Sequence, residues 1–459
     1  MTARKRVLIV VGSYCPTMTP DMHRARILCY ELPAQGWDVE ILTPDTSFQR
    51  CVTVDAQDAV FFDAKTPVHS ATAWLPWAFR LAQMNGIGFR SLWPMFRLGH
   101  HLLKTKRFDL VYFSTTQFPL FILGPLWHAI DRVPYVLDFQ DPWYSRKQKY
   151  VATSRRWKWI VSGWLARPLQ RFAVGRAGAI VAVSPRYLEE LRTTYRGQAF
   201  PWLAPDRQAV VPFAGANVDI ETARRASGDP LPAAQHAACD ATQPSAKLPI
   251  VYVGAGGITR LKAWEALCRA AILVRNHNPS LIERFQFRLF GTTGDPAAAD
   301  AGLLEQTGKA LGLEGFVTEH PAQVSYFRSL TLAHRAAGLV VLGVDDASYT
   351  PSKLFNYLLF EQPVLAVCHA QSPAAAFLRS HPTLAYLICF DSEQPCPAES
   401  GAEVLEQYLQ AVAAGRRQAR AADLADYLAP AMARAHAALF DRCAKPGEPS
   451  NSSQGIAAQ

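Results

Sequence analysis

The chain has 459 residues, of which 49% are hydrophobic and 19% are charged, and its formal net charge is +9 at pH 7. The length is too great for one compact core and the composition excludes a disordered chain, so we expect two globular domains. The basic excess predicts an anionic partner, which can be a phosphorylated small molecule, an acidic membrane surface or nucleic acid.

The cysteines and the N-terminus indicate the cellular compartment. The nine cysteines form no CxxC pair and no cluster at metal-ligand spacing, which argues against a disulfide framework and a structural zinc site. No run of 18 apolar residues is present, and "MTARKRVLIVVGSY" ends in a turn without a small-residue cleavage site. We interpret this segment as the first core strand and expect a cytoplasmic protein.

Residues 1–220 alternate short apolar runs with helical segments. Alternation of this kind predicts a parallel sheet with helices on both faces, which is the doubly wound α/β class. The predicted strands are "RVLIVVGSY", "WDVEILTP", "FDLVYFST", "VPYVLDF" and "GAIVAVS". The predicted helices cover residues 23–35, 118–130, 155–175 and 185–195.

A strongly basic, tryptophan-containing stretch follows at residues 142–176, where no acidic residue occurs between Asp141 and Glu189. Lys and Arg next to Trp suit the headgroup layer of an anionic bilayer. We therefore predict membrane contact at the inner face of the cell membrane through Arg155, Arg156, Trp157, Lys158 and Trp159. The alternative is a basic surface helix with one face in the core. Nucleic acid ranks lower, because no recognition module accompanies the stretch, and we expect no nucleic-acid partner.

Two carboxylates stand at the end of a predicted strand in "YVLDFQDPW", namely Asp138 and Asp141. At such a position a carboxylate can orient a hydroxyl group or accept its proton, so we predict a catalytic role for them. The structural alternative is that one of them caps the following turn.

The alternation restarts after residues 221–247, which are rich in Ala, Pro and polar residues and are predicted to be a linker or an inserted loop. Residues 248–443 are predicted to form a second Rossmann-like domain that ends in terminal helices, and residues 444–459 a disordered tail. The expected architecture is two Rossmann-like domains that face each other across a cleft.

Three turns of the second half carry a predicted phosphate site, because ligands of open α/β sheets bind beyond the carboxyl ends of the strands. Glycine turns permit close approach of backbone to a diphosphate, and cations at a helix start attract it. In "VYVGAGGITRLK" the candidates are Gly254, Gly256, Gly257, Arg260 and Lys262. "LFGTTGD" adds Gly291. The alternative is that these glycines serve packing alone.

The stretch "YTPSKLFNYLLFEQPVLAV" places a hydroxyl and an ammonium group, Ser352 and Lys353, where a helix is predicted to begin. The first N–H groups of a helix lack internal partners, so this position attracts anions. Alternatively, Ser352 is only an N-cap and Lys353 a solvated charge. A spaced GxGxxG with a following acidic residue is absent, as is GxxxxGK[ST], which argues against dinucleotide-binding and P-loop domains.

Taken in order, "RVLIVVGSYCP", "VPYVLDFQDPW", "AIVAVSP", "VYVGAGGITRLK" and "PSKLFNYLLFEQPVLAV" resemble the GT-B-fold glycosyltransferases of the family 4-like group, from about residue 6 to 430. The resemblance implies a nucleotide-diphosphate sugar held by the second domain, an acceptor held by the first, and retaining transfer without an obligatory metal or other cofactor. It also implies that the diphosphate is held by Gly256, Arg260, Lys262, Ser352 and Lys353.

The chain departs from the family pattern at several positions. Asn356 stands where relatives carry a glutamate that binds the donor ribose, and Gln140 stands where many have a histidine. Ala255 replaces a frequent arginine, for which Arg260 can compensate. Residues 17–21 replace a glycine pair.

We therefore expect a hexosyltransferase that builds a surface polysaccharide or glycolipid on a lipid-linked acceptor. The alternatives are a non-catalytic GT-B module that binds a nucleotide sugar or a partner transferase, and a sugar-nucleotide epimerase of the same fold.

Overall fold

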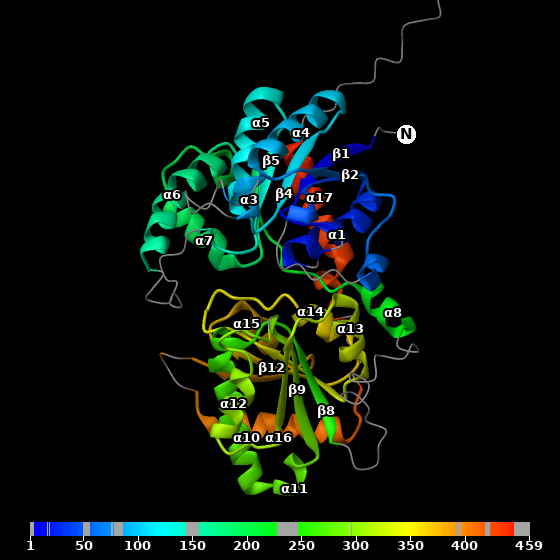
Figure 1. The fold of residues 1–459 in the computed structure, drawn as a ribbon, viewed down its shortest axis with the longest axis vertical. Helices are drawn as coiled ribbons and strands as arrows, with labels where there is room; N and C mark the ends of the chain where they lie inside the picture. The colour runs from blue at the N-terminus through cyan, green and yellow to red at the C-terminus, as the bar shows by residue number, and fades with distance from the viewer. Residues whose placement is uncertain are drawn as a thin grey trace, which may run out of the picture.

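The computed structural model describes residues 4–15, 17, 19–48, 56–74, 77, 86–143, 156–226, 247–294, 296–391, 393, 396–417 and 423–444. Two α/β domains lie one above the other, each built around its own sheet (Figure 1). The expected architecture of two Rossmann-like domains is confirmed.

The sheet of the first domain has seven parallel strands in the order β3-β2-β1-β4-β5-β6-β7. The strands are β1 (Lys5–Val10), β2 (Trp37–Pro44), β3 (Val68–Ala71), β4 (Leu110–Ser114), β5 (Tyr135–Phe139), β6 (Ala179–Ala182) and β7 (Gln208–Val210). The main helices are α1 (Pro20–Glu31), α3 (Ile87–Arg90), α4 (Leu92–Thr105), α5 (Leu123–Asp131), α6 (Arg156–Val174) and α7 (Pro185–Thr194). The sequence reading did not anticipate β3, α3 and α4.

The second sheet has six strands in the order β10-β9-β8-β11-β12-β13. These strands are β8 (Leu248–Val253), β9 (Phe285–Gly294), β10 (Val317–Ala322), β11 (Gly338–Leu342), β12 (Val364–His369) and β13 (Tyr386–Phe390). Its helices are α10 (Leu261–His277), α11 (Pro279–Ile282), α12 (Leu303–Ala310), α13 (Tyr326–Arg335), α14 (Leu354–Leu359), α15 (Pro373–Ser380) and α16 (Ala398–Ala413).

The central strands are buried along their whole length, which explains their continuous apolar runs. Every residue of β4, β5 and β12 is buried. A parallel strand covered by helices on both faces has no solvent side, so its sequence does not alternate between apolar and polar residues. The helices cover both faces and leave the carboxyl ends of the strands toward the space between the domains.

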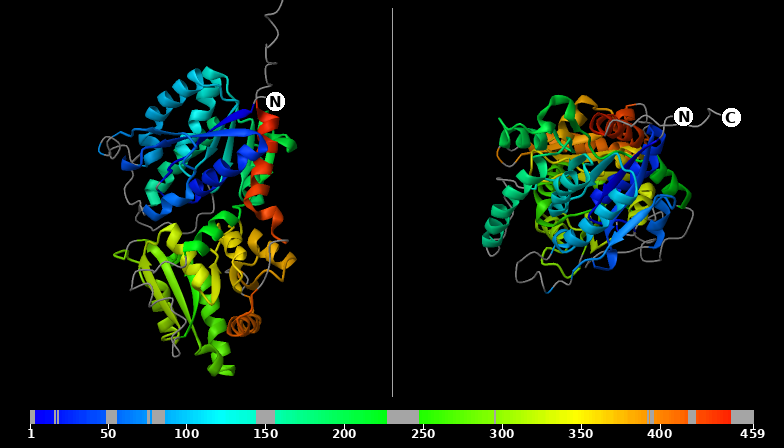
Figure 2. Two further views of the ribbon diagram at one scale, coloured as in Figure 1. Left: turned by 90° about the vertical axis from the view of Figure 1, so that its right-hand side faces the viewer. Right: turned by 90° about the horizontal axis from the view of Figure 1, so that it is seen from above.

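The last helix, α17 (Ala429–Cys443), corrects the expected domain boundaries, because it returns to the first domain. Met432, Leu439 and Phe440 belong to the cluster that packs β1, β2 and α1, and the Phe440 ring lies 5.5 Å from that of Trp37. Figure 2 shows this helix alongside the first domain. Its apolar face completes a core that residues 1–220 leave uncovered.

The chain crosses between the domains twice, and the two crossings are bonded to each other. One leads from β7 into α8 (Asn217–Ala226), and the other leads into α17. Gly215 N–H donates to the Tyr427 carbonyl at 2.9 Å, and Ala429 N–H donates to the Gly215 carbonyl at 2.9 Å. The two segments therefore form one short ladder at the domain boundary.

Two predicted segments, the linker and the C-terminal tail, fall largely outside the residues that the structure describes. Most of the predicted linker, residues 227–246, and the tail after residue 444 lie outside them. Among the helices that are described, none is long and apolar enough to cross a bilayer.

Candidate functional site

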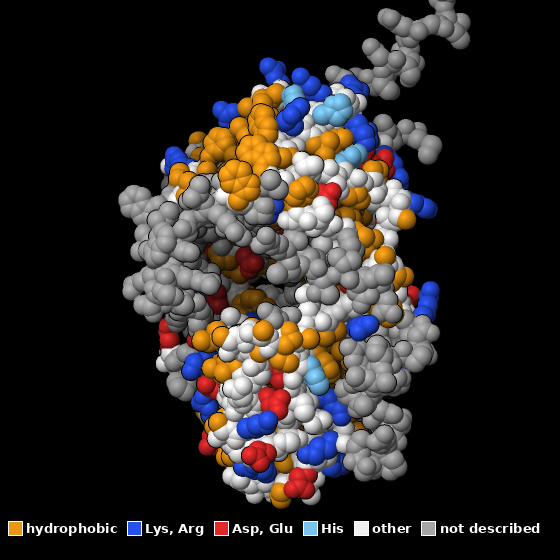
Figure 3. All heavy atoms as spheres, in the orientation of Figure 1, with side chains coloured by type: hydrophobic (Ala, Val, Ile, Leu, Met, Phe, Trp, Pro, Cys, Tyr) orange, Lys and Arg blue, Asp and Glu red, His pale blue; other side chains and the backbone are white. Residues whose placement is uncertain are grey.

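A pocket of about 350 Å³ lies between the two domains. His23 and Arg24 line it from the first domain, and Arg260, Lys353 and Asn356 line it from the second. Figure 3 shows the hollow at the middle of the molecule. Its position beyond the carboxyl ends of both sets of strands is where open α/β sheets bind ligands.

Six of the nine predicted donor-binding residues meet in this pocket. They are Gly254, Arg260, Gly291, Ser352, Lys353 and Asn356. The structure therefore brings together three turns that are up to 100 residues apart in the sequence, as the parallel topology requires.

The other three predicted residues do not line the pocket. Gly256 packs against β9, where an added Cβ would lie 2.7 Å from Thr292 Cβ, and Gly257 has φ +59° with Asp300 beside it. Lys262 Nζ lies 3.5 Å from Glu265 on the exposed side of α10. The two glycines serve packing of the turn, as the alternative interpretation holds, and Lys262 points away from the site.

Lys353 lies at the predicted helix start, because it is the N-cap residue of α14, which spans six residues and receives no side-chain cap. The Lys353 ammonium group instead turns inward and donates to the Val253 carbonyl at the end of β8. Gly254, at φ +146°, makes room for it, because an added Cβ would lie 2.5 Å from Nζ. Burial, and then the charge of Arg260, lower the pKa of Lys353 to about 8.

Arg260 is the second cation of the pocket and is 9% exposed. Its guanidinium group donates to the Tyr349 hydroxyl at 2.8 Å and lies 4.9 Å from the centre of that ring. Its Nε has no hydrogen-bond partner among the described residues. Two cations held together without an acidic partner in the described part of the chain make a site suited to a diphosphate.

Asn356 holds the two domains together. Its Oδ1 accepts from Ala216 N–H at 3.0 Å, and its Nδ2 donates to the Tyr326 hydroxyl at 3.2 Å. Tyr326 in turn donates to Asp219 at 2.6 Å. The amide that stands in place of the ribose-binding glutamate is thus engaged in the domain interface.

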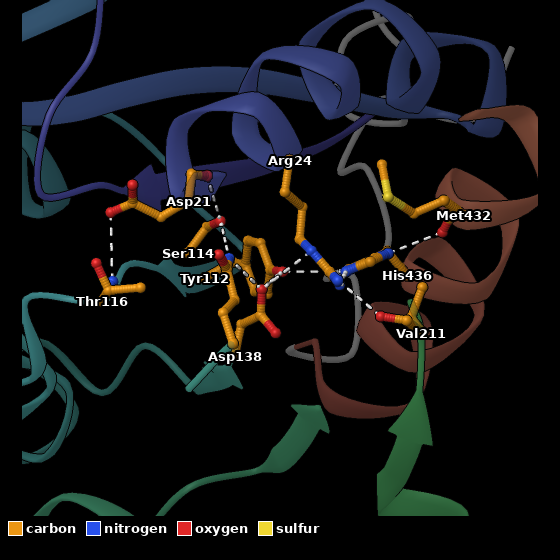
Figure 4. Close-up of polar contacts among 10 residues, drawn as sticks. Asp21, Arg24, Tyr112, Ser114, Thr116, Asp138, Val211, Met432 and His436 are labelled. Atoms are coloured by element: carbon orange, nitrogen blue, oxygen red, sulfur yellow. Dashed lines mark hydrogen bonds and ion pairs between the residues drawn. The ribbon is translucent and has the colours of Figure 1, made fainter. Parts of the chain in front are cut away.

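Asp138, for which a catalytic role is predicted, is held in a buried polar network and does not line the pocket. Its side chain is completely buried, and its Oδ2 lies 3.3 Å from Arg24 Nε and accepts from the Tyr112 hydroxyl at 2.9 Å. Gln140 donates to the same oxygen at 2.7 Å. Arg24 also reaches the Val211 carbonyl, and His436 of α17 lies 3.0 Å from the Tyr112 hydroxyl (Figure 4). Asp138 therefore takes part in a buried polar network that joins β5 to α1 and, through Tyr112, to α17.

Asp141 is exposed, and its charge acts across the cleft. Loss of solvation, and then the charge of Asp21, raise its pKa to about 6. The charge of Asp141 also contributes to the raised pKa values of Tyr187 and of Tyr349, the partner of Arg260. The charge of Asp141 therefore reaches side chains of both domains, although Asp141 itself does not line the pocket, and its catalytic role stays a prediction.

Several pocket residues were missed by the sequence reading. The ring of His23 of α1 packs against that of Tyr326 with the centres 4.3 Å apart and the planes tilted by 49°, and its Nδ1 has no hydrogen-bond partner among the described residues. Burial, then the charges of Arg26 and Lys353, hold the pKa of His23 well below its usual value, so the ring is neutral near pH 7. The signal was the polar stretch "TPDMHR" directly after the first strand.

The predicted membrane-contact residues cannot be placed by their side chains. Arg155 lies outside the described residues, and Arg156, Trp157, Lys158 and Trp159 fall in the first turn of α6, where only the backbone is described. Their membrane contact stays a prediction.

Two facing α/β domains with a ligand pocket between them define the GT-B fold. Comparison with solved structures finds the same fold in several proteins. The UDP-forming α,α-trehalose-phosphate synthase from Burkholderia xenovorans has a TM-score of 0.62 and 12% identity, covering 96% of this chain and 99% of that one. Alr3699/HepE of Anabaena, solved with UDP-glucose, has a TM-score of 0.52 and 14% identity, covering 95% of both chains. The UDP-GlcNAc 2-epimerase from Neisseria meningitidis, bound to UDP-GlcNAc, has a TM-score of 0.53 and 11% identity, covering 95% of this chain and 100% of that one.

Comparison of the sequence with protein families gives further evidence on the class of the first domain. Residues 23–214 match the family described as "Glycosyl transferase 4-like domain". Within this GT-B fold, the first domain is therefore similar to the glycosyl transferase 4-like domain, and the resemblance to the family 4-like group is confirmed for residues 23–214. A search of the curated proteins found no match for the chain.

Replacing Asp141 with asparagine is expected to lower kcat about a hundredfold to ten-thousandfold if Asp141 accepts the acceptor proton. Because only the ionised carboxylate accepts a proton, wild-type kcat/KM should rise with pH through about 6 and level above it. The pH profile of sugar transfer measures this. A rising limb near pH 6 that persists in the Asp141→Asn variant would assign the base to another group.

Proposed function

We propose that the protein transfers a sugar from a nucleotide-diphosphate sugar to a glycan acceptor, which is lipid-linked, in the synthesis of a surface polysaccharide or glycolipid. The observation that carries the proposal is the pair of cations in the pocket, Arg260 and Lys353, with Gly254 leaving the backbone open beside them. The glycosyl transferase 4-like domain supports the reaction class. Retention of the anomeric configuration follows from the family resemblance alone.

The chemistry assigned to each group follows from its position. Departure of the nucleoside diphosphate develops negative charge, which Arg260 and Lys353 stabilise without reorganisation because they are already fixed in the pocket. Asp141 takes the proton of the attacking hydroxyl. The proposal invokes no metal and no cofactor besides the donor, because these cations neutralise the leaving group.

A nucleotide sugar is the proposed donor partly because HepE was solved with UDP-glucose and the epimerase with UDP-GlcNAc. The acceptor domain is the first one, and an anionic membrane at the inner face of the cell membrane is the proposed site of the lipid-linked acceptor. The basic stretch at residues 142–176 supports that location.

The proposal is tested by calorimetric titration of the protein with UDP, GDP, ADP and their common sugars, repeated with Lys353→Ala. We expect micromolar binding of one nucleotide, weakened at least about tenfold by the substitution, since a charge-assisted hydrogen bond is lost. Wild-type affinity should also fall as pH rises above about 8, where the Lys353 ammonium group loses its proton. No binding by any nucleotide to the folded protein would reject the donor site.

The non-catalytic alternative is favoured by one observation, which is that Asn356 is occupied by Ala216 and Tyr326 and not free for a ribose. The epimerase alternative is favoured by the fold likeness to the UDP-GlcNAc 2-epimerase. Incubation with the donor that binds separates the three. A new glycosidic bond supports transfer, an epimerised sugar supports the epimerase, and an unchanged donor with every acceptor supports the binding module.

A further inference from the structure

Positive charge is concentrated in one part of the first domain. Residues 64–188 contain eighteen Lys and Arg but only four Asp and Glu, whereas the rest of the chain holds twenty-nine basic and thirty-four acidic residues. One of those four acids is Asp138, which is completely buried. The basic character of the whole protein therefore comes from this segment, which includes α3 to α6.

Within this segment, the outer side of α4 combines aromatic and basic side chains. We call it the α4 face, and it consists of Trp74, Trp93, Phe96, Arg97, His101 and Lys104. Trp93 is 53% exposed and Trp74 51% exposed. The ring of Trp93 stacks on that of Phe96 at 5.5 Å and 20°.

The helical spacing keeps Trp93, Arg97 and His101 out of the core, whereas Phe96 is half-buried and packs against it. Trp93, Arg97 and His101 follow one another at intervals of four residues and share one side of α4. The opposite side of α4 carries the buried residues Met95, Gly99, Leu102 and Leu103. Trp74 lies near the start of α4, because its backbone N–H donates to the carbonyl of Arg90, two residues before α4, at 3.1 Å. The exposed indoles thus serve no packing role that the described core requires.

This combination is that of a membrane-interface surface. Indole rings, with an apolar body and a polar N–H, prefer the headgroup level of a bilayer, and Lys and Arg are attracted to anionic lipids. Figure 3 shows the hydrophobic side chains of the upper domain on the same face as the hollow between the domains, with basic side chains and histidines at their margin. A bilayer in contact with this surface would lie on the side where the cleft opens.

We propose that the α4 face docks the protein on an anionic lipid bilayer, so that a lipid-linked acceptor reaches the cleft from the membrane surface. The surface differs from the one predicted at residues 155–159. The proposal rests on the proposed function for its purpose, but lipid binding is tested without the reaction.

The experiment is co-sedimentation of the full chain with phosphatidylcholine vesicles, with and without phosphatidylglycerol. We expect binding only to the anionic vesicles, reduced by added salt, and lowered at least about tenfold in Trp93→Ser/Arg97→Glu, which removes one indole and reverses one charge. Both positions are exposed, so the variant should keep the wild-type melting temperature. The control is Val218→Ser/Arg225→Glu on α8, which also removes one exposed apolar side chain and reverses one exposed arginine charge.

Three results would overturn the proposal. These are equal binding to both kinds of vesicle, undiminished binding by the α4-face variant, and a concentration-dependent dimer that only this variant abolishes, which would make the face an interface between copies. A protein that binds a nucleotide sugar but no vesicles refutes docking alone. One that binds vesicles but no nucleotide refutes the proposed function alone.

Discussion

Replacing Arg260 with methionine is expected to lower kcat/KM for sugar transfer about a hundredfold to a thousandfold, the usual effect of removing one preorganised group that stabilises charge in the transition state. The guanidinium group is held by Tyr349 and is nearly buried, so its interaction with a diphosphate is weakly screened by solvent. Methionine keeps a flexible apolar stem similar to that of arginine and removes the charged guanidinium group. Steady-state kinetics with the donor identified by titration measures the effect.

Lys262→Met is the matched control, because it removes a positive charge two residues away on the exposed side of α10. We expect it to change kcat/KM less than about twofold, since its surface ion pair with Glu265 contributes little. Tyr349→Phe keeps the charge of Arg260 but removes the hydroxyl that positions it. We expect its loss of kcat/KM to lie between those of Lys262→Met and Arg260→Met. If Lys262→Met were as damaging as Arg260→Met, the phosphate site would lie on the other side of the turn.

Replacing Asp219 with alanine is expected to lower the free energy of unfolding by about 3–5 kcal/mol, because it leaves a buried arginine without its counter-ion. Asp219 accepts two hydrogen bonds from Arg26, at 2.9 and 2.5 Å, and both side chains are almost completely buried. Burial alone would lower the pKa of Arg26, but the charge of Asp219 raises it. The pair joins α1 of the first domain to α8 and, through Tyr326, to α13 of the second.

Guanidinium unfolding followed by circular dichroism measures this loss. Asp38→Ala is the control, since Asp38 forms an exposed pair with Arg4 at 3.2 Å and should matter by less than about 1 kcal/mol. A loss at Asp219 no larger than that at Asp38 would show that Arg26 finds other partners or water once its carboxylate is gone.

The alternation of apolar runs and helical segments was enough to predict both sheets, because parallel strands covered on both faces carry an unmistakable composition. The same logic placed Gly254, Arg260 and Lys353 in one pocket, since strand ends on one edge must meet. What the sequence could not give was the direction of individual side chains. Lys262 follows Arg260 by two residues, yet the turn of the helix sends the two cations to opposite sides.

The direction of the side chain is also what the sequence could not predict for Asp138 and Asp141. Both stand at the end of β5, but Asp138 is still within the strand and points into the core, whereas Asp141 lies beyond it. Spacing alone cannot decide which carboxylate meets Arg24, because Arg24 comes from a helix more than 100 residues earlier. The sequence also did not predict which domain α17 packs against, since the pattern of an amphipathic helix fits either domain equally well.

The return of α17 gives the first domain a discontinuous sequence, with consequences for how the polypeptide acquires its structure during translation. The ribosome releases residues 5–210 long before the helix that covers Trp37 and β1. Until α17 has been synthesised, that apolar surface has no intramolecular cover, while the second domain is already complete, so of these two domains the one begun first is finished last. An expression fragment that stops after β7 would lack this helix, whereas a fusion of residues 4–216 to residues 429–444 through a short linker would restore it.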